Sequence, residues 1–311
     1  MTIDHSLDRR LVIVENPRNS NARKVAREVF GLLEDHGICY EHITTRYSDA
    51  ESNSIDLAEQ LRDGDRVIAA AGDGTGSQLA NAILRSDVDA EAGFLPYGNF
   101  NDLASTYTKL GSSVLDLIGA ETVTSIPLAI TVNGSHWRYA PAYATIGWSA
   151  AAAGSFDHTV SRYMTRNTLP SLKRGASLAQ VVYQYYRHRV HYLPDFATSN
   201  DKAVHHHLTD IMAINGPIVA GSIGTDRCWY DSSQFGYKEL DVSRFFPNVI
   251  FGLQALTRQM PLNPAQTVTI SFNETTRLPI QTEGEHARID AHQVTISKNH
   301  NNRLMIVSTK T

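Results

Sequence analysis

Short apolar runs alternate with amphipathic stretches along the first third of the chain. Three runs have the length and composition of strands, at residues 11–14, 39–45 and 67–71. Two stretches between them have the period of a helix, at residues 22–33 and 55–61, and Ser54 is placed to cap the second. This alternation predicts a Rossmann-like parallel sheet with helices on both faces.

From residue 125 the pattern changes to short runs in which apolar and polar positions alternate. Asn133-Gly134 separates two such runs, 126–132 and 136–143, and predicts a hairpin because both turn residues tolerate positive φ. Further candidate strands lie at residues 211–214, 268–272, 278–281, 293–297 and 304–307. We therefore expect an α/β domain over residues 1–124 and a mostly antiparallel, β-rich domain over residues 125–311.

The composition argues against several classes of protein. A net charge of −4 with 19% charged residues gives no global reason to expect a nucleic-acid partner. Cys39 and Cys228 lie far apart, so the sequence predicts neither a disulfide framework nor a zinc site. The first residues lack a basic segment followed by an apolar core, and no apolar run is long enough to span a membrane. We therefore expect a cytoplasmic protein.

The run Ala71-Gly72-Asp73-Gly74-Thr75-Gly76 joins the third predicted strand to a helix expected over residues 78–84. Glycines on both sides of Asp73 let the backbone turn tightly and approach a ligand. The helix N-terminus favours an anion and predicts a phosphate site; an ordinary turn with Asp73 as the helix cap is the alternative. The loop lacks the lysine of a P-loop and the third glycine of G-x-G-x-x-G, so neither a Walker-type ATPase nor an ordinary dinucleotide dehydrogenase is predicted.

Polar segments also follow the other predicted strands of the first domain. They occupy residues 16–20, 44–49 and 96–102, the last after a fourth strand at 93–95. Ligands on parallel sheets bind beyond the carboxyl ends of the strands. We therefore expect these segments and the Gly72 loop to converge on one crevice.

Four segments, taken in order, resemble motifs of the diacylglycerol kinase catalytic-domain family, which includes sphingosine kinases and bacterial lipid kinases and is related to NAD kinases. Residues 16–20 are similar to N-P-x-S-G, residues 72–75 to the end of G-G-D-G-T, residues 96–102 to P-x-G-T-x-N-D, and residues 281–285 to a D-G-E segment. The resemblance spans nearly the whole chain. Its G-x-x-N-D element favours lipid kinases over NAD kinases.

The resemblance implies transfer of the γ-phosphoryl group of ATP, with Mg²⁺, to a lipid hydroxyl. It implies that the nucleotide is bound by Gly72, Asp73, Gly74 and Thr75, with Asn16, Ser20, Thr44, Asn99, Asn101 and Asp102. Asp73 would act through Mg²⁺ or its waters, and Glu285 would be the general base for the hydroxyl proton. Two alternatives stay open: Asp102 as the cap of a helix over residues 103–107, and Glu285 as a surface glutamate in a turn.

The chain departs from the family motifs at Ala71, Asn99 and Glu283, where glycine, threonine and aspartate are usual. A loop that holds a structural Mg²⁺ in bacterial members corresponds to residues 231–241, where Asp231 is left as a candidate ligand. Two further functions therefore stay open. One is phosphorylation of NAD or another small alcohol, and the other is nucleotide or lipid binding without catalysis.

Residues 158–194 contain no carboxylate and mix basic with aromatic side chains. This composition predicts peripheral contact with an anionic membrane, such as the inner face of the cell membrane, and a solvated basic helix is the alternative. His205-His206-His207 is either a metal-binding tract or an exposed loop. The expected partners are ATP and a lipid acceptor, without nucleic acid.

Overall fold

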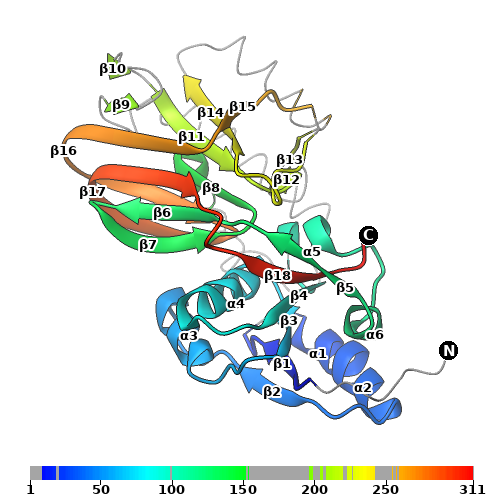
Figure 1. Ribbon diagram of the computed structural model, residues 1–311. Helices are drawn as coiled ribbons and strands as arrows, with labels where there is room; N and C mark the ends of the chain where they lie inside the picture. The colour runs from blue at the N-terminus through cyan, green and yellow to red at the C-terminus, as the bar shows by residue number, and fades with distance from the viewer. Residues whose placement is uncertain are drawn as a thin grey trace. The chain divides into compact units, whose positions relative to one another are not determined.

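The computed structural model describes residues 9–18, 21–98, 100–151, 153, 196–198, 204–205, 208–219, 223–225, 227–241, 254, 257 and 259–310. The chain forms two compact units (Figure 1). Unit 1 consists of Met1–Pro127 and His300–Thr311, and unit 2 of Leu128–Asn299. Each unit has its own hydrophobic core.

Unit 1 is built on a six-stranded sheet. The strand order is β2 (Glu41–Thr44), β1 (Leu11–Glu15), β3 (Arg66–Ala71), β4 (Glu91–Pro96), β18 (Leu304–Ser308) and β5 (Glu121–Ser125). Neighbouring strands are parallel except for β18 and β5. All six residues of β3 are buried, as expected for a parallel strand that is covered on both faces.

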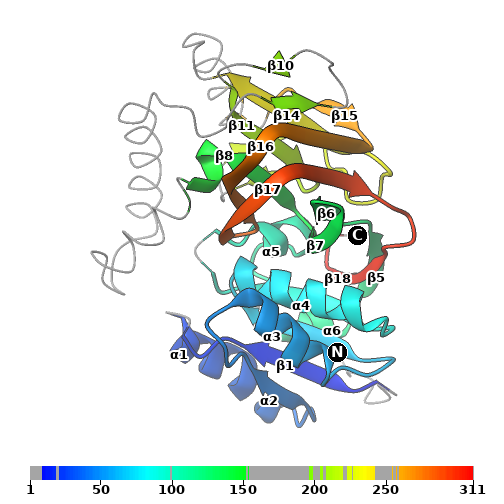
Figure 2. The same cartoon turned by 90° about the vertical axis from the view of Figure 1, so that its left-hand side faces the viewer.

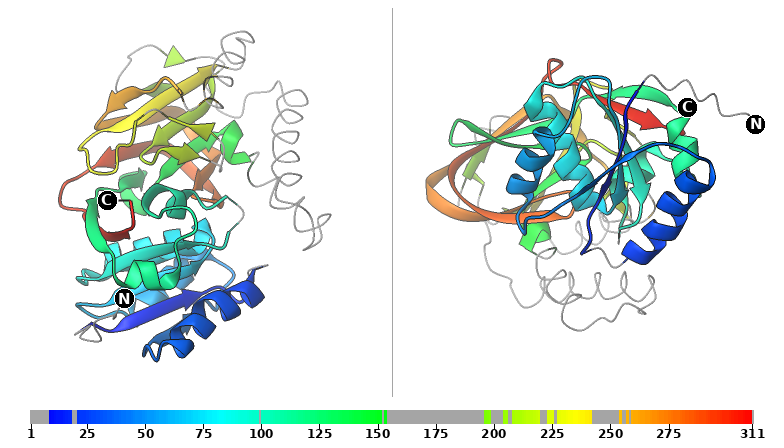
Figure 3. Two further views of the ribbon diagram at one scale, coloured as in Figure 1. Left: turned by 90° about the vertical axis from the view of Figure 1, so that its right-hand side faces the viewer. Right: turned by 90° about the horizontal axis from the view of Figure 1, so that it is seen from below.

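Helices cover both faces of this sheet. On one face α1 (Ala22–Val25), the π-helical segment η1 (Ala26–Phe30) and α2 (Gly31–Asp35) follow one another, and α6 (Val114–Ile118) lies beside α2. On the other face lie α3 (Ala50–Ala58), α4 (Asp73–Ser86) and α5 (Asp102–Tyr107) (Figures 2 and 3). The core beneath α1, α2 and α6 includes Val29, Leu33, Leu117, Ile13 and Ile68.

Helix α3 begins earlier than predicted and has a different cap. The Asp49 carboxylate accepts a hydrogen bond from Ser52 N at 2.8 Å, so Asp49 is the N-cap. The prediction of Ser54 as the cap is wrong, because its hydroxyl donates to Ala50 O, one turn back in the helix, at 2.9 Å. A carboxylate at this position also interacts favourably with the positive end of the helix dipole.

The C-terminal strand lies in unit 1, although the sequence pattern placed residues 300–311 with the β-rich domain. Strand β18 is parallel to β4, with Met305 opposite Glu91, and antiparallel to β5, from Leu304 opposite Ser125 onward. Leu304 and Ile306 are fully buried there. A short apolar strand has the same local pattern in either sheet, so the pattern contains no information about which sheet it joins.

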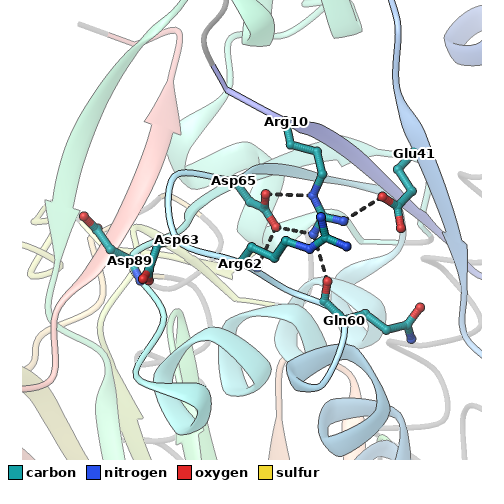
Figure 4. A network of polar contacts seen from close by, with 7 residues as sticks. All are labelled: Arg10, Glu41, Gln60, Arg62, Asp63, Asp65 and Asp89. Atoms are coloured by element: carbon teal, nitrogen blue, oxygen red, sulfur yellow. Dashed lines mark hydrogen bonds and ion pairs between the residues drawn. The ribbon is translucent and has the colours of Figure 1, made fainter.

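A cluster of charged side chains connects β1 and β3 at their amino-terminal ends (Figure 4). Arg10 donates from Nε and Nη2 to the Asp65 carboxylate at 2.9 and 2.6 Å, and from Nη2 to Gln60 O at 2.8 Å. Asp65 is buried and also accepts from Arg62 N at 2.8 Å. The hydrogen bond to Asp65 raises the pKa of Arg10 above its ordinary value. This cluster stabilises the sheet at the edge opposite to the carboxyl ends of the strands.

Unit 2 is an antiparallel β structure. The strand order is β15 (Asn263–Ala265), β14 (Phe235–Asp241), β11 (Leu208–Ile214), β8 (Tyr143–Gly147), β16 (Thr267–Thr282), β17 (Glu285–Lys298), β6 (Leu128–Val132) and β7 (Ser135–Ala140). Strand β9 (Phe196–Thr198) pairs with β10 (Val204–His205) and β16, and β12 (Ile218–Val219) pairs with β13 (Ile223–Gly224). The core of this unit includes Ile130, Ile146, Ile211, Ile280 and Ile296.

The predicted fold class is confirmed: an α/β sheet structure and an antiparallel β structure. The predicted β6–β7 hairpin is present, with φ of 52° at Asn133 and 83° at Gly134. The runs 268–272 and 278–281 are two parts of one strand, β16, whose pairing with β17 is irregular between Ser271 and Thr276. No helix in the described part of the chain is long and apolar enough to cross a membrane.

Candidate functional site

The strand order of unit 1 contains a topological switch point between β1 and β3. The chain continues from β1 to β2 on one side, and β3 lies on the other side of β1. Ligands of such sheets bind at the carboxyl ends of the two central strands. Asn16 follows β1, Thr44 ends β2 opposite Glu15, and Gly72 follows β3. The structure therefore brings these three predicted residues to one edge of the sheet.

The Gly72 loop leads directly into α4. Gly72 is the N-cap in an extended conformation, with φ −88° and ψ 178°, and Gly76 N makes the first helical hydrogen bond, to Gly72 O at 3.1 Å. The N–H groups of Gly74 and Thr75 precede that first donor, so the helix itself does not use them. Together with the helix dipole they favour an anion at this end of α4.

The backbone of the Gly72 loop touches the loop that follows β4. A Cβ atom on Gly98 would lie 2.6 Å from Gly72 Cα, and one on Gly72 would lie 3.0 Å from Gly98 Cα. Neither glycine has positive φ. Glycine is therefore required at both positions for a close backbone contact, which joins two of the predicted nucleotide segments.

The Asp73 side chain connects the Gly72 loop with the start of α5, and the Asn101 side chain stabilises the loop after β4. Asp73 Oδ1 accepts a hydrogen bond from Leu103 N at 2.9 Å, and Asn101 Oδ1 accepts from Gly98 N at 2.6 Å. Desolvation raises the pKa of Asp73, while hydrogen bonds from the backbone of Leu103, Asp102 and Asn101 oppose that rise. Asp73 therefore stabilises the first turn of α5, thirty residues away in the sequence.

The cap of α5 differs from the one that the sequence suggested. Asn101 occupies the N-cap position with a left-handed backbone, φ 60° and ψ 41°, and Asp102 is the first residue of the helix. The Asp102 side chain is fully buried. Asp102 is therefore not the N-cap, and the carboxylate that accepts from the helix N-terminus comes from Asp73.

Ala71 stands where the family motif has its first glycine. The residue is 3% exposed and lines a small cavity of about 10 Å³, together with Gly72, Phe94 and Leu103. The methyl group is thus accommodated inside unit 1. This volume leaves no room for a ligand, so a nucleotide at this edge would bind on the outer side of the loops.

Unit 2 contains the acidic segment of residues 281–285 as a tight hairpin turn. Glu283 and Gly284 have φ of 38° and 84°, and Thr282 is paired with Glu285 across the turn. Glu283 Oε1 accepts hydrogen bonds from Ala142 N at 2.7 Å and Tyr143 N at 3.0 Å. A left-handed glutamate costs on the order of 1–3 kcal/mol, and two hydrogen bonds to a buried carboxylate offset this cost.

Glu285, the predicted general base, is the first residue of β17 and is partly exposed. Its position next to the anchored turn gives it a fixed backbone. The sequence had treated Glu283 only as a replacement for aspartate. The contact of Glu283 with the start of β8 could not be recognised from the sequence, because Ala142 and Tyr143 take part through their backbone N–H groups.

Several predicted residues lie outside the described part of the chain: Ser20, Asn99, residues 158–194, His206 and His207. Asp231 is described and exposed. Within the described ranges, no three His, Cys, Asp or Glu side chains are grouped so that they could hold a metal ion. Asp231 therefore belongs to no such group of three among these residues.

Comparisons with known proteins found a family match for the N-terminal part of the chain. Residues 10–129 match the model of the diacylglycerol kinase catalytic domain. A Staphylococcus haemolyticus protein named "Putative lipid kinase SH2167" is 32% identical over 72 residues, which are 21% of this chain and 23% of that protein. The chain thus aligns with about a quarter of this curated relative.

Solved structures share the fold over nearly the whole chain. A Bacillus anthracis structure titled "putative diacylglycerol kinase" has a TM-score of 0.64 at 17% identity, with 97% of each chain covered. A second structure from the same organism, titled as a diacylglycerol kinase, has a TM-score of 0.62 at 13% identity, also with 97% coverage of both chains. At these identities the likeness shows the fold.

Proposed function

Since residues 10–129 match the model of the diacylglycerol kinase catalytic domain, we propose that the protein transfers the γ-phosphoryl group of ATP to the hydroxyl group of a lipid of the diacylglycerol class. The carrying observation is the contact between Gly72 and Gly98 at the N-terminus of α4. In this contact the loop after β3, beside the switch point of a parallel sheet, touches the loop after β4 backbone to backbone. This is a geometry suited to phosphate groups.

In this proposal the residues of unit 1 bind and orient the nucleotide. The N–H groups of Gly74 and Thr75 and the α4 dipole would bind phosphate oxygens, with Asn16 and Thr44 at the adjacent strand ends. Mg²⁺ carried with ATP would neutralise phosphate charge. Asp73 Oδ1 already accepts a backbone hydrogen bond from Leu103 N, so Asp73 would bind the waters of such an ion and would keep the Gly72 loop close to α5.

Glu285 of unit 2 would accept the proton of the lipid hydroxyl. The turn before it is held by the two hydrogen bonds to Glu283. A base whose backbone is fixed in this way loses little entropy when the acceptor hydroxyl is bound. Removal of a general base slows the reaction by about 10²–10⁴-fold.

The experiment measures transfer of labelled γ-phosphate from ATP with Mg²⁺ to diacylglycerol, sphingoid bases and NAD. Glu285→Gln is compared with Glu274→Gln, a change of an exposed carboxylate on the same hairpin. We expect transfer to diacylglycerol, a loss of at least about 100-fold in kcat for Glu285→Gln, and wild-type rates for the control. ATP should raise the Tm of all three proteins.

Three results would contradict the proposal in different ways. Phosphorylation of NAD alone would identify a small-molecule kinase. A rise in Tm with ATP but no product on any acceptor would identify a nucleotide-binding protein without transfer. Equal kcat values for Glu285→Gln and the wild type would exclude Glu285 as the base.

A further inference from the structure

Lys298, the last residue of β17, is buried in unit 2. Its side chain is surrounded by oxygen atoms: Nζ donates to Asn215 Oδ1 at 2.7 Å, to Trp229 O at 2.6 Å and to Gln234 O at 3.3 Å. The residue is 4% exposed. An ammonium group in such a position lacks bulk water, so these three oxygens provide its solvation.

The number and kind of these contacts fit the charged form of the lysine. An ammonium group has three N–H donors and no acceptor, and the structure gives it three oxygen acceptors. A neutral amine would have to point its lone pair at an oxygen. Burial lowers the pKa of Lys298 to about 7, while the charges of Asp231 and Cys228 oppose this shift.

The same oxygens are of the type that binds hard cations. Trp229 O and Gln234 O are carbonyls at the two ends of one short loop, and Asn215 Oδ1 is an amide oxygen at the end of β11. Backbone and amide carbonyls are ordinary ligands of Ca²⁺ and Mg²⁺. The structural Mg²⁺ that the family resemblance implies for this region does not fit here, because Lys298 Nζ occupies the space between these ligands.

We propose that Lys298 is a built-in cation, whose ammonium group takes the place of a structural metal ion and makes the loop of residues 229–234 independent of divalent cations. The proposal concerns the folding of unit 2 and does not depend on kinase activity. Loss of the ammonium group leaves three oxygens that face one another without a cation. A small cation that enters the space would then restore stability.

The lysine also stabilises backbone that carries the acidic turn. Asn215, which accepts from Lys298, donates from Nδ2 to Pro141 O at 2.7 Å and from N to Ala142 O at 2.7 Å. Ala142 N in turn donates to Glu283. Lys298 is therefore connected to the hairpin turn through Asn215 and the Pro141-Ala142 backbone.

The test uses thermal denaturation of the full chain without nucleotide. The pH is about 6, below the pKa of Lys298, so that the lysine is charged. The variants are Lys298→Met, Lys298→Ala and, as a control, Lys109→Met, which changes an exposed lysine. We expect the wild-type Tm to be the same in EDTA and in Mg²⁺, and metal analysis of the purified protein to give no stoichiometric divalent ion. Lys298→Met should lower Tm by about 5–15 °C and the control by about 0–2 °C.

Chemical rescue distinguishes a lost cation from lost packing. Ethylammonium should raise the Tm of Lys298→Ala by several degrees more than sodium at equal ionic strength, and should leave wild type unchanged. Three results would overturn the proposal: a wild-type Tm that falls in EDTA and recovers with Mg²⁺, one divalent ion per chain, or a Lys298→Met variant that melts with the wild type. If Lys298→Ala does not fold, the metal analysis of the wild type and the Tm of Lys298→Met still test the proposal.

Discussion

Gly98→Ala tests the backbone contact on which the proposed nucleotide site depends. The new Cβ would lie 2.6 Å from Gly72 Cα and 3.0 Å from Asn101 Oδ1, whereas ordinary contacts of this kind measure 3.4–4 Å. The two loops must therefore separate by about 1 Å. Such overpacking costs about 1–3 kcal/mol.

The same separation lengthens the hydrogen bond that connects the Gly72 loop with the start of α5. Asp73 Oδ1 to Leu103 N measures 2.9 Å, and an added 1 Å weakens this bond. At about 1 kcal/mol for a lost hydrogen bond, the total reaches roughly 2–4 kcal/mol. For a unit of this size, that corresponds to a fall in Tm of about 5–15 °C.

Thermal and urea denaturation measure this loss, and equilibrium binding of ATP with Mg²⁺ measures its effect on the site. We expect Gly98→Ala to bind ATP at least about tenfold more weakly, since loop separation moves the N–H groups that we propose to bind phosphate. Gly31→Ala is the matched control: the φ of Gly31 is −58° and the nearest atom to a new Cβ is 3.8 Å away, so the change should stabilise unit 1 by about 0.5–1 kcal/mol. If Gly98→Ala melts and binds ATP like the wild type, the contact has no role in the site.

Three further predictions concern buried carboxylates. Glu283→Ala should lower the stability of unit 2 by about 2–5 kcal/mol because Ala142 N and Tyr143 N lose their acceptor, whereas Glu283→Gln, which keeps an acceptor oxygen, should lose less in the same urea titration. Asp65→Ala should cost about 2–4 kcal/mol because Arg10 then lacks its main partner, and an unchanged urea midpoint would count against this. Desolvation raises the pKa of Asp210 to about 7 against hydrogen bonds from Ser149. The protonated form is therefore favoured in the folded state, and its stabilisation, complete below about pH 4, is lost as pH rises through 7. The Tm of Asp210→Asn relative to wild type should increase between pH 4 and 8, and a constant difference would contradict the assignment.

The elements of unit 1 were predictable where one local signal dominates. The apolar sequence of β3 and the amphipathic sequence that begins at Ala22 each favour a single type of secondary structure. The start of α4 was placed five residues too late, because Gly and Asp have low helix propensity. In the first turn of a helix that propensity matters little, and the partner of Asp73 lies in another helix, α5.

The candidate site was predictable as a set of motifs but not as a set of contacts. The Gly-Asp-Gly-Thr run indicated a phosphate loop. The structure adds that the close backbone contact with Gly98 requires glycine at position 72. No local pattern could show that Asp73 stabilises α5, or that Glu283 accepts hydrogen bonds from the backbone at the start of β8. Lys298 had no sequence signal at all, since its partners are two backbone carbonyls and one amide.

The position of β18 has a consequence for how the chain folds during synthesis. Among the described strands, β5 is hydrogen-bonded only to β18, so β5 has no place in the sheet until residues 304–308 have left the ribosome. Unit 2, about 170 residues, is made in between. At ~5–20 residues per second this delay lasts on the order of 10–30 s. During that time the free edge of β4 is open to pairing with other chains, which makes this interval the point at which a chaperone would matter most.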